Sequence, residues 1–217
     1  MNTFRTKPSR TQLIAALASN DSSMRLKAAL AIGSNPEQGL VDILVSRCAI
    51  EPDFFVRDML TWALIRFPAE VTVPKLLAEL HCKCAQARSQ ALHTLSKIKD
   101  TSTWPAITRS LLHDSNDEVA QSAWRTAVVL VPSGQEKGLA DELATQFGRG
   151  SRDMQLSLSL AIVALGEEAI ESIIEAAIAS DNPGVKAHGR TTLLLLHDSD
   201  SGFQYAVDQV KRIFAPT

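Results

Sequence analysis

The sequence predicts an all-α protein, an α-α superhelix built as a solenoid of about six helical hairpins of similar length. Three observations carry this prediction: a repeat of 31 to 35 residues, apolar positions with helical spacing in every repeat, and a capping residue before each apolar stripe. No segment alternates apolar and polar residues between turn dipeptides. We therefore expect no β-sheet.

Each repeat contains one apolar residue, here called the anchor, near the start of the second (B) helix of its hairpin. Successive anchors are 32, 31, 32, 35 and 31 residues apart. Apolar or small residues recur four, seven and eight positions beyond each anchor, which traces one stripe along an α-helix. The residue seven beyond is small in every copy, so that a second helix can approach closely. The anchors are Met24, Val56, Ala87, Val119, Met154 and Val185.

The residue three positions before each anchor marks the start of a helix. In five of the six copies its side chain can accept hydrogen bonds from the free amides of a first helical turn. Pro183 follows the last of these residues, at the helix position that tolerates proline best. The six positions are Asp21, Asp53, Cys84, Asn116, Ser151 and Asn182, of which Cys84 is the exception.

Shorter apolar-periodic segments lie between the B helices and predict the first (A) helix of each hairpin. Pro74 and Pro105 are expected near the starts of two of them. An amphipathic segment from Phe203 to Phe214 predicts a half-repeat that caps the C-terminal end. We expect an N-terminal arm at 1–9 and a single solenoid domain at 10–217. The A segments are Leu13–Leu17, Leu40–Leu44, Val73–Leu80, Trp104–Leu111, Leu139–Phe147 and Ile170–Ala177.

The stretch from Asn20 to Gly33 combines an Asp cap, the pair Met24-Arg25, two adjacent small residues and a closing glycine. It resembles the B helix of a HEAT repeat of the short phycobilisome-lyase-like type. The resemblance covers roughly residues 10–214 and is looser in the later repeats, where Ala120 and Gln155 replace the Arg. The chain is similar to stand-alone bacterial HEAT-repeat proteins. This implies an armadillo-like, right-handed solenoid with B helices along its concave side, and a role in binding other proteins.

A basic residue directly follows the anchor in four repeats, at Arg25, Arg57, Arg88 and Lys186. One interpretation is a row of cations that binds phosphates or an acidic peptide. The other, which we favour, is structural: each side chain pairs with capping Asp or carbonyl groups of an adjoining repeat, as the resemblance to the HEAT pattern implies.

Residues two, five, six and nine positions beyond each anchor are predicted to face the concave side. Several are aromatic or aliphatic, and an exposed apolar strip with Trp and Arg is typical of an interaction surface. The alternative is that neighbouring B helices bury these groups against each other. The predicted partner-binding residues are Arg57, Asp58, Thr61, Trp62, Arg88, His93, Trp124 and Arg125.

Charge and cysteine usage limit the cellular setting. The net charge of −2 argues against a general nucleic-acid binder, although residues 1–100 carry a net +4 and residues 101–217 a net −6. The three cysteines, Cys48, Cys82 and Cys84, fit free thiols in a reducing compartment. Apolar runs are too short to span a bilayer. We expect a cytoplasmic protein without membrane contact.

The sequence contains no nucleophile-elbow motif, P-loop or glycine-rich phosphate cradle. The segment His81 to Cys84 has metal-ligand residue types but no second ligand pair, so we predict no metal and no cofactor. The first hypothesis is a non-enzymatic scaffold that binds a protein or peptide. An alternative is a nucleic-acid enzyme resembling the HEAT-like alkylpurine DNA glycosylases, and a chromophore-lyase role is a third. The partner's identity and any homo-oligomerisation stay open.

Overall fold

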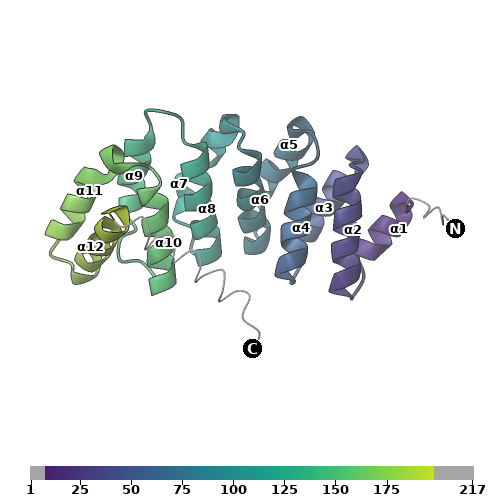
Figure 1. Ribbon diagram of the computed structural model, residues 1–217, viewed down its shortest axis with the longest axis horizontal. Coiled ribbons are helices and arrows are strands. Elements are labelled where there is room, and N and C mark those ends of the chain that lie inside the picture. Colours follow the sequence, from purple (N-terminus) through teal and green to yellow (C-terminus); the bar gives the residue numbers. More distant parts are fainter. Residues whose placement is uncertain (1–7, 198–217) are drawn as a thin grey trace. The chain divides into compact units, whose positions relative to one another are not determined.

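The computed structural model describes residues 8–197, and every regular element in this range is a helix (Figure 1). The predicted all-α fold, of the α-α superhelix class, is confirmed. The A helices are α1 (Arg10–Leu17), α3 (Val41–Cys48), α5 (Ala69–Glu79), α7 (Arg109–Leu112), α9 (Glu136–Ala144) and α11 (Glu167–Ala179). The B helices are α2 (Ser22–Ser34), α4 (Phe54–Leu64), α6 (Ala85–Ile98), α8 (Asp117–Leu130), α10 (Arg152–Val163) and α12 (Pro183–His197).

The chain divides into two compact units, Met1–Ala106 and Ile107–Thr217, where the sequence predicts one domain over 10–217. In the first unit the B helices α2, α4 and α6 pack side by side, and in the second α8, α10 and α12 do so. No charged residue lies between positions 101 and 106, so the units carry the net charges of +4 and −6 found in the two halves of the sequence. The predicted capping segment Phe203–Phe214 lies outside the described residues, as does most of the predicted arm.

The predicted caps start the B helices. Oδ1 of Asp53 accepts hydrogen bonds from the amides of Phe55 and Val56 at 2.9 and 3.1 Å. Side-chain oxygens of Asn116 and Ser151 accept from amides three residues later at 3.2 and 3.3 Å. Each such cap stabilises its helix by about 1 kcal/mol. Cys84 makes no side-chain cap bond, as its residue type predicts.

The predicted stripes form most of the core. Val56, Val119 and Met154 are at most 1% exposed. Met24 is 44% exposed, so the prediction of a buried first anchor is wrong. The eight-residue helix α1 is too short to cover the whole length of α2, and the buried stripe of α2 starts at Arg25.

Two A segments differ from their predicted form. Residues 101–112 form a 3-10 helix, η2 (Thr101–Ala106), and the short helix α7, in place of one continuous helix. Pro105 lies in η2, and the extended backbone of Thr108 (φ −77°, ψ 160°) separates η2 from α7. α5 begins at Ala69, which places Pro74 inside the helix. A further 3-10 turn, η1 (Gln38–Leu40), precedes α3.

None of the helices in residues 8–197 combines the length and the apolar character that crossing a bilayer requires.

Candidate functional site

The arginines after the anchors hold the loops that precede their own helices. Nη1 of Arg57 donates to the carbonyl oxygens of Glu51 and Pro52 at 2.9 and 2.8 Å. Nη1 of Arg88 donates to the carbonyls five and six residues earlier at 3.1 and 2.8 Å, and Arg25 does the same. The structural interpretation of these arginines is therefore supported, with a correction: these carbonyls belong to the same hairpin.

Gln155 takes over this role in the fifth repeat. Its Nε2 donates to the carbonyl oxygens of Gly150 and Gly148, both at 3.3 Å. The amide nitrogen of Gln155 carries two hydrogens and can donate to two carbonyls. Nη1 of Arg25, Arg57 and Arg88 does the same. Gln155 thus continues the loop contact although it carries no charge. An amide can meet this requirement, which shows that hydrogen-bond donation is sufficient there.

A buried carboxylate that was not predicted from the sequence joins α2, α3 and α4. Glu51 is fully buried and accepts hydrogen bonds from Nε and Nη2 of Arg25 at 2.8 and 2.7 Å. Nε of Arg47 and the amide of Asp53 donate at 2.8 and 3.0 Å. Desolvation alone would raise the pKa of Glu51, but these hydrogen bonds outweigh it and hold the pKa at about 2. Glu51 lies in a loop, outside the apolar stripes of the helices, so no periodic pattern in the sequence indicates that it is buried.

Trp124, a predicted partner-binding residue, is instead part of the core. Its side chain is fully buried, and Nε1 donates to the carbonyl oxygen of Leu112 at 2.8 Å, which ties α8 to α7. Thr61 is also buried, at 3% exposure, with its Oγ1 3.4 Å from Oγ1 of Thr94 on α6. The prediction that these two side chains face a partner is wrong.

The residue five positions beyond the anchor is buried in each of the first five repeats, because adjacent B helices pack against each other there. In the second unit, Oγ of Ser159 lies 2.8 Å from Oγ1 of Thr192. This pair and Thr61–Thr94 both join position five of one repeat to position seven of the next. The predicted small residue at position seven therefore marks the helix contact. The buried position-five residues are Ala29, Thr61, Leu92, Trp124 and Ser159.

Ser159 also contacts a buried histidine. His188 on α12 accepts a hydrogen bond at Nδ1 from the amide of Gly148 at 3.0 Å. Its Nε2 lies 3.0 Å from Oγ of Ser159, so the neutral tautomer with a proton on Nε2 satisfies both contacts. Desolvation lowers the pKa of His188. This histidine is a structural link between α10, α12 and the loop after α9.

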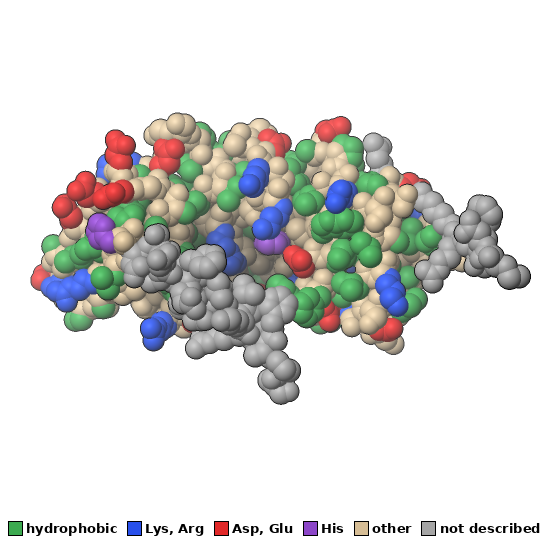
Figure 2. Space-filling view, viewed as in Figure 1, with side chains coloured by type: hydrophobic (Ala, Val, Ile, Leu, Met, Phe, Trp, Pro, Cys, Tyr) green, Lys and Arg blue, Asp and Glu red, His purple; other side chains and the backbone are tan. Residues whose placement is uncertain are grey.

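Trp62 lies on the surface of the first unit and packs over α2. A Cβ atom placed on Gly33 would lie 2.4 Å from the Trp62 ring, so only glycine allows this approach. The Arg66 guanidinium lies 4.5 Å from the ring centroid. Leu30 on α2 and Ile65 on α4 are 45% and 39% exposed, and Figure 2 shows hydrophobic side chains gathered over these two helices, here called the α2–α4 patch.

The other predicted residues of the first unit lie near this patch in sequence but differ in exposure. Asp58 is exposed on α4, and His93 is half-buried on α6. Arg57 and Arg88 are half-buried and engaged with loop carbonyls, as described above. Asp58 is therefore the exposed member of the predicted set in this unit, and Trp62 is half-buried.

The second unit contains a groove between α8 and α10, here called the α8–α10 groove. Its volume is about 530 Å³, within the range of small-ligand sites. Val129 and Leu160 are 41% and 37% exposed along it. Arg125, a predicted site residue, lies exposed in its wall. The lining residues are Gln121, Arg125, Val128, Val129, Asp153, Leu156, Ser157, Leu160, Ala161 and Ala164.

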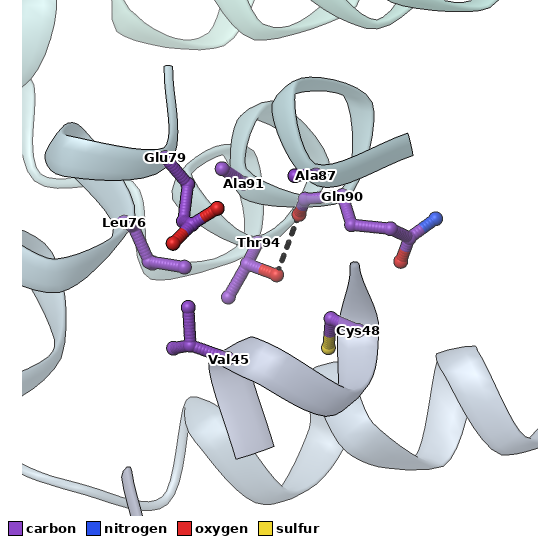
Figure 3. Close-up of a pocket in the computed structure, with 8 residues that line it drawn as sticks. All are labelled: Val45, Cys48, Leu76, Glu79, Ala87, Gln90, Ala91 and Thr94. Carbon is purple, nitrogen blue, oxygen red and sulfur yellow. Dashed lines mark hydrogen bonds between the residues drawn. The ribbon is translucent and has the colours of Figure 1, made fainter. Parts of the chain in front are cut away.

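A second, much smaller cavity lies among α3, α5 and α6 (Figure 3). Its volume is about 10 Å³, the space of about one water molecule. Burial raises the pKa of the Cys48 thiol on its wall to about 12, so this cysteine is no nucleophile at neutral pH. Thr94 donates to the carbonyl of Gln90 at 2.8 Å and leaves its methyl group toward the cavity. We interpret this cavity as a packing void.

The cysteine-containing turn after α5 makes hydrogen bonds of its own. Sγ of Cys82 accepts from the amide of Cys84 at 3.4 Å, and Sγ of Cys84 donates to the carbonyl of Ala49 at 3.5 Å. In the part of the chain that the structure describes, no three His, Cys, Asp or Glu side chains are placed to hold a metal ion.

No protein-family model matches the sequence, and no curated protein matches it. Among solved structures, two engineered proteins are similar at 18% and 15% identity, each with a TM-score of 0.47. They cover 88% and 85% of this chain, and it covers 96% of each of theirs.

A third similar solved structure is the complex of CpcE and CpcF of phycocyanin lyase from Nostoc sp.. The identity is 17% and the TM-score 0.49, over 87% of this chain and 77% of that one. Similarity at this level concerns the arrangement of helices and carries no information about the ligand.

Proposed function

We propose that this protein is a non-enzymatic interaction module whose α8–α10 groove binds a peptide segment of a partner protein. The observation that supports the proposal is the groove itself: a cavity of about 530 Å³ whose walls carry exposed aliphatic side chains from two neighbouring B helices. Covering such exposed apolar side chains with a ligand makes a favourable contribution to the free energy of binding.

The groove suits an amphipathic peptide better than a flat surface contact. Val128, Val129, Leu156 and Leu160 come from facing sides of α8 and α10, so a ligand lying between the helices touches both walls. Burying the exposed part of such a side chain contributes on the order of 1 kcal/mol. A helix that presents apolar residues three and four apart would place them against both walls.

The groove residues offer binding groups and few catalytic ones. Its ionisable lining residues are Arg125 and Asp153, and no histidine or cysteine lines it. Nucleophilic catalysis requires a nucleophile beside a base, and Ser157 has no histidine beside it in this lining. We therefore favour binding over catalysis, and we assign the repeats to the HEAT type on their caps and loop-binding arginines.

The two other hypotheses have less support. A site for a nucleic-acid backbone needs several cations to neutralise phosphates, whereas the groove lining holds one arginine and one aspartate in a unit of net charge −6. A chromophore-lyase role rests on repeat resemblance, and no residue in the groove lining identifies a chromophore.

The test uses the full chain and a display library of random peptides about three helical turns long. Selected peptides are synthesised, and their affinity is measured by fluorescence anisotropy for the wild type and for Val129→Asp and Leu160→Asp. Ile50→Asp is the control, because Ile50 is 67% exposed and belongs to the other unit. Circular dichroism verifies the fold of each variant.

We expect both groove variants to weaken binding by about tenfold or more, since each places a charge against the apolar ligand surface. The control should bind as the wild type does. Equal affinity of all four proteins, or failure to select any binding peptide, would overturn the proposal.

A further inference from the structure

We propose that the ligand of the α8–α10 groove carries an acidic side chain between its apolar residues, and that this side chain pairs with Arg125. This inference rests on the proposed function and specifies the chemistry of the partner.

Arg125 lies on the groove side of α8. Gln121 precedes it by four residues and Val128 and Val129 follow by three and four, so all four side chains share one helix face, and all of them line the groove. The contact of Arg125 with the protein is a hydrogen bond from Nη2 to Oγ of Ser122 at 3.4 Å. This bond is long and its acceptor is neutral, which leaves most of the guanidinium donors for a ligand.

Arg125 differs from two other arginines of the same unit. Arg109 pairs with Glu142 at 2.9 Å, and Arg149 pairs with Asp117 at 3.3 Å. Arg125 forms no ion pair with any residue in 8–197. An anionic group of a ligand would therefore find a guanidinium with donors free for a charge-assisted hydrogen bond.

The electrostatics of Arg125 agree with this geometry. Although its side chain is exposed to solvent, the surrounding groove walls desolvate the guanidinium and lower its pKa. The group stays charged at pH 7, because an arginine pKa remains far above neutrality. Desolvation strengthens any ion pair that forms there compared with one on an open surface.

The other charged lining residue, Asp153, favours a basic ligand less than Arg125 favours an acidic one. It lies in the first turn of α10, where the positive end of the helix dipole stabilises a carboxylate. Its negative charge is therefore partly compensated within the protein. Arg125 sits in the middle of α8, where no helix terminus compensates its charge.

The experiment is a double-mutant cycle on the peptides selected in the display experiment. Each acidic peptide is compared with its Glu→Gln form and its Glu→Lys form, and the proteins are the wild type, Arg125→Gln, Arg125→Glu and Asp153→Asn. We expect Arg125→Gln to weaken the acidic peptide by about tenfold or more, which is about 1.4 kcal/mol, and to leave the Gln peptide nearly unchanged. Arg125→Glu should prefer the Lys peptide, and Asp153→Asn should change affinity less than about threefold.

The outcomes separate this inference from the proposed function. If the selected peptides lack acidic residues, or if the Glu and Gln forms bind the wild type equally while Leu160→Asp abolishes binding, the groove binds peptides but the pairing with Arg125 is wrong. If Val129→Asp and Leu160→Asp bind as the wild type does, the groove is not the binding site and both proposals fail.

Discussion

Replacing Glu51 by Gln tests whether one buried carboxylate holds the first two hairpins together. The substitution keeps the size of the side chain but removes its charge. Arg25, which is 5% exposed, would then lack its counter-ion, and the amide nitrogen of Gln would face one of the guanidinium donors. Arg47, the second partner, is more exposed and can turn toward water.

Two estimates give the size of the effect. The pKa of Glu51 falls from 4.5 to about 2 on folding. At about 1.4 kcal/mol per pKa unit, this corresponds to roughly 2–3 kcal/mol after allowance for screening by solvent. Removal of one partner from a buried ion pair costs about 3–5 kcal/mol. We therefore expect Glu51→Gln to lower the free energy of unfolding by about 3 kcal/mol.

Urea denaturation followed by circular dichroism measures this loss at pH 7. Asp42→Asn is the matched control, because the Asp42–Lys75 pair is exposed and contributes about 0–1 kcal/mol. The pKa of Glu51 is depressed on folding, so its contribution is complete above pH 4.5 and declines as the pH falls toward 2. The gap between wild type and Glu51→Gln should narrow between pH 4.5 and 3. A loss below about 1 kcal/mol at pH 7 would refute the reasoning.

Three further predictions follow from packing and burial. Trp124→Ala should lower the free energy of unfolding by about 3–5 kcal/mol and Trp62→Ala by less, because Trp124 is fully buried and Trp62 is partly exposed; the reverse order in urea denaturation would contradict this. The free energy of unfolding should fall as the pH drops below 6.5, because the pKa of His188 is lowered and the folded state disfavours its protonation. His188→Gln should reduce this dependence of stability on pH. An unchanged pH dependence in the variant would contradict the prediction. Gly33→Ala should lower the free energy of unfolding by about 1–3 kcal/mol, because the added Cβ would collide with Trp62. Gly138→Ala, with open space around the added Cβ, should leave stability unchanged or raise it. Thermal unfolding of both variants measures these effects.

Much of the fold was predictable because its determinants are local. A cap such as Asp53 bonds to amides two and three residues away, and an anchor such as Val56 defines a stripe within one helix. Helical period and capping depend on neighbouring residues in the chain, so they can be read from the sequence.

The buried ion network could not be predicted in this way. Glu51 lies in the loop between α3 and α4, and its partner Arg25 is 26 residues distant. Its role depends on the closeness of α2, α3 and α4 in space. No periodic pattern distinguishes it from a surface glutamate.

The candidate site shows the same division between sequence and structure. The sequence by itself determined the helices, their caps and the side of each B helix that packs on its hairpin partner. The tertiary structure decided which remaining side chains are exposed. Trp124 stands five positions beyond its anchor and Trp62 six beyond, a difference of about 100° around the helix. Contacts between neighbouring B helices bury position five and leave position six accessible. The angle at which two B helices pack decides which of these positions lies in the contact, and this angle is set by packing between repeats.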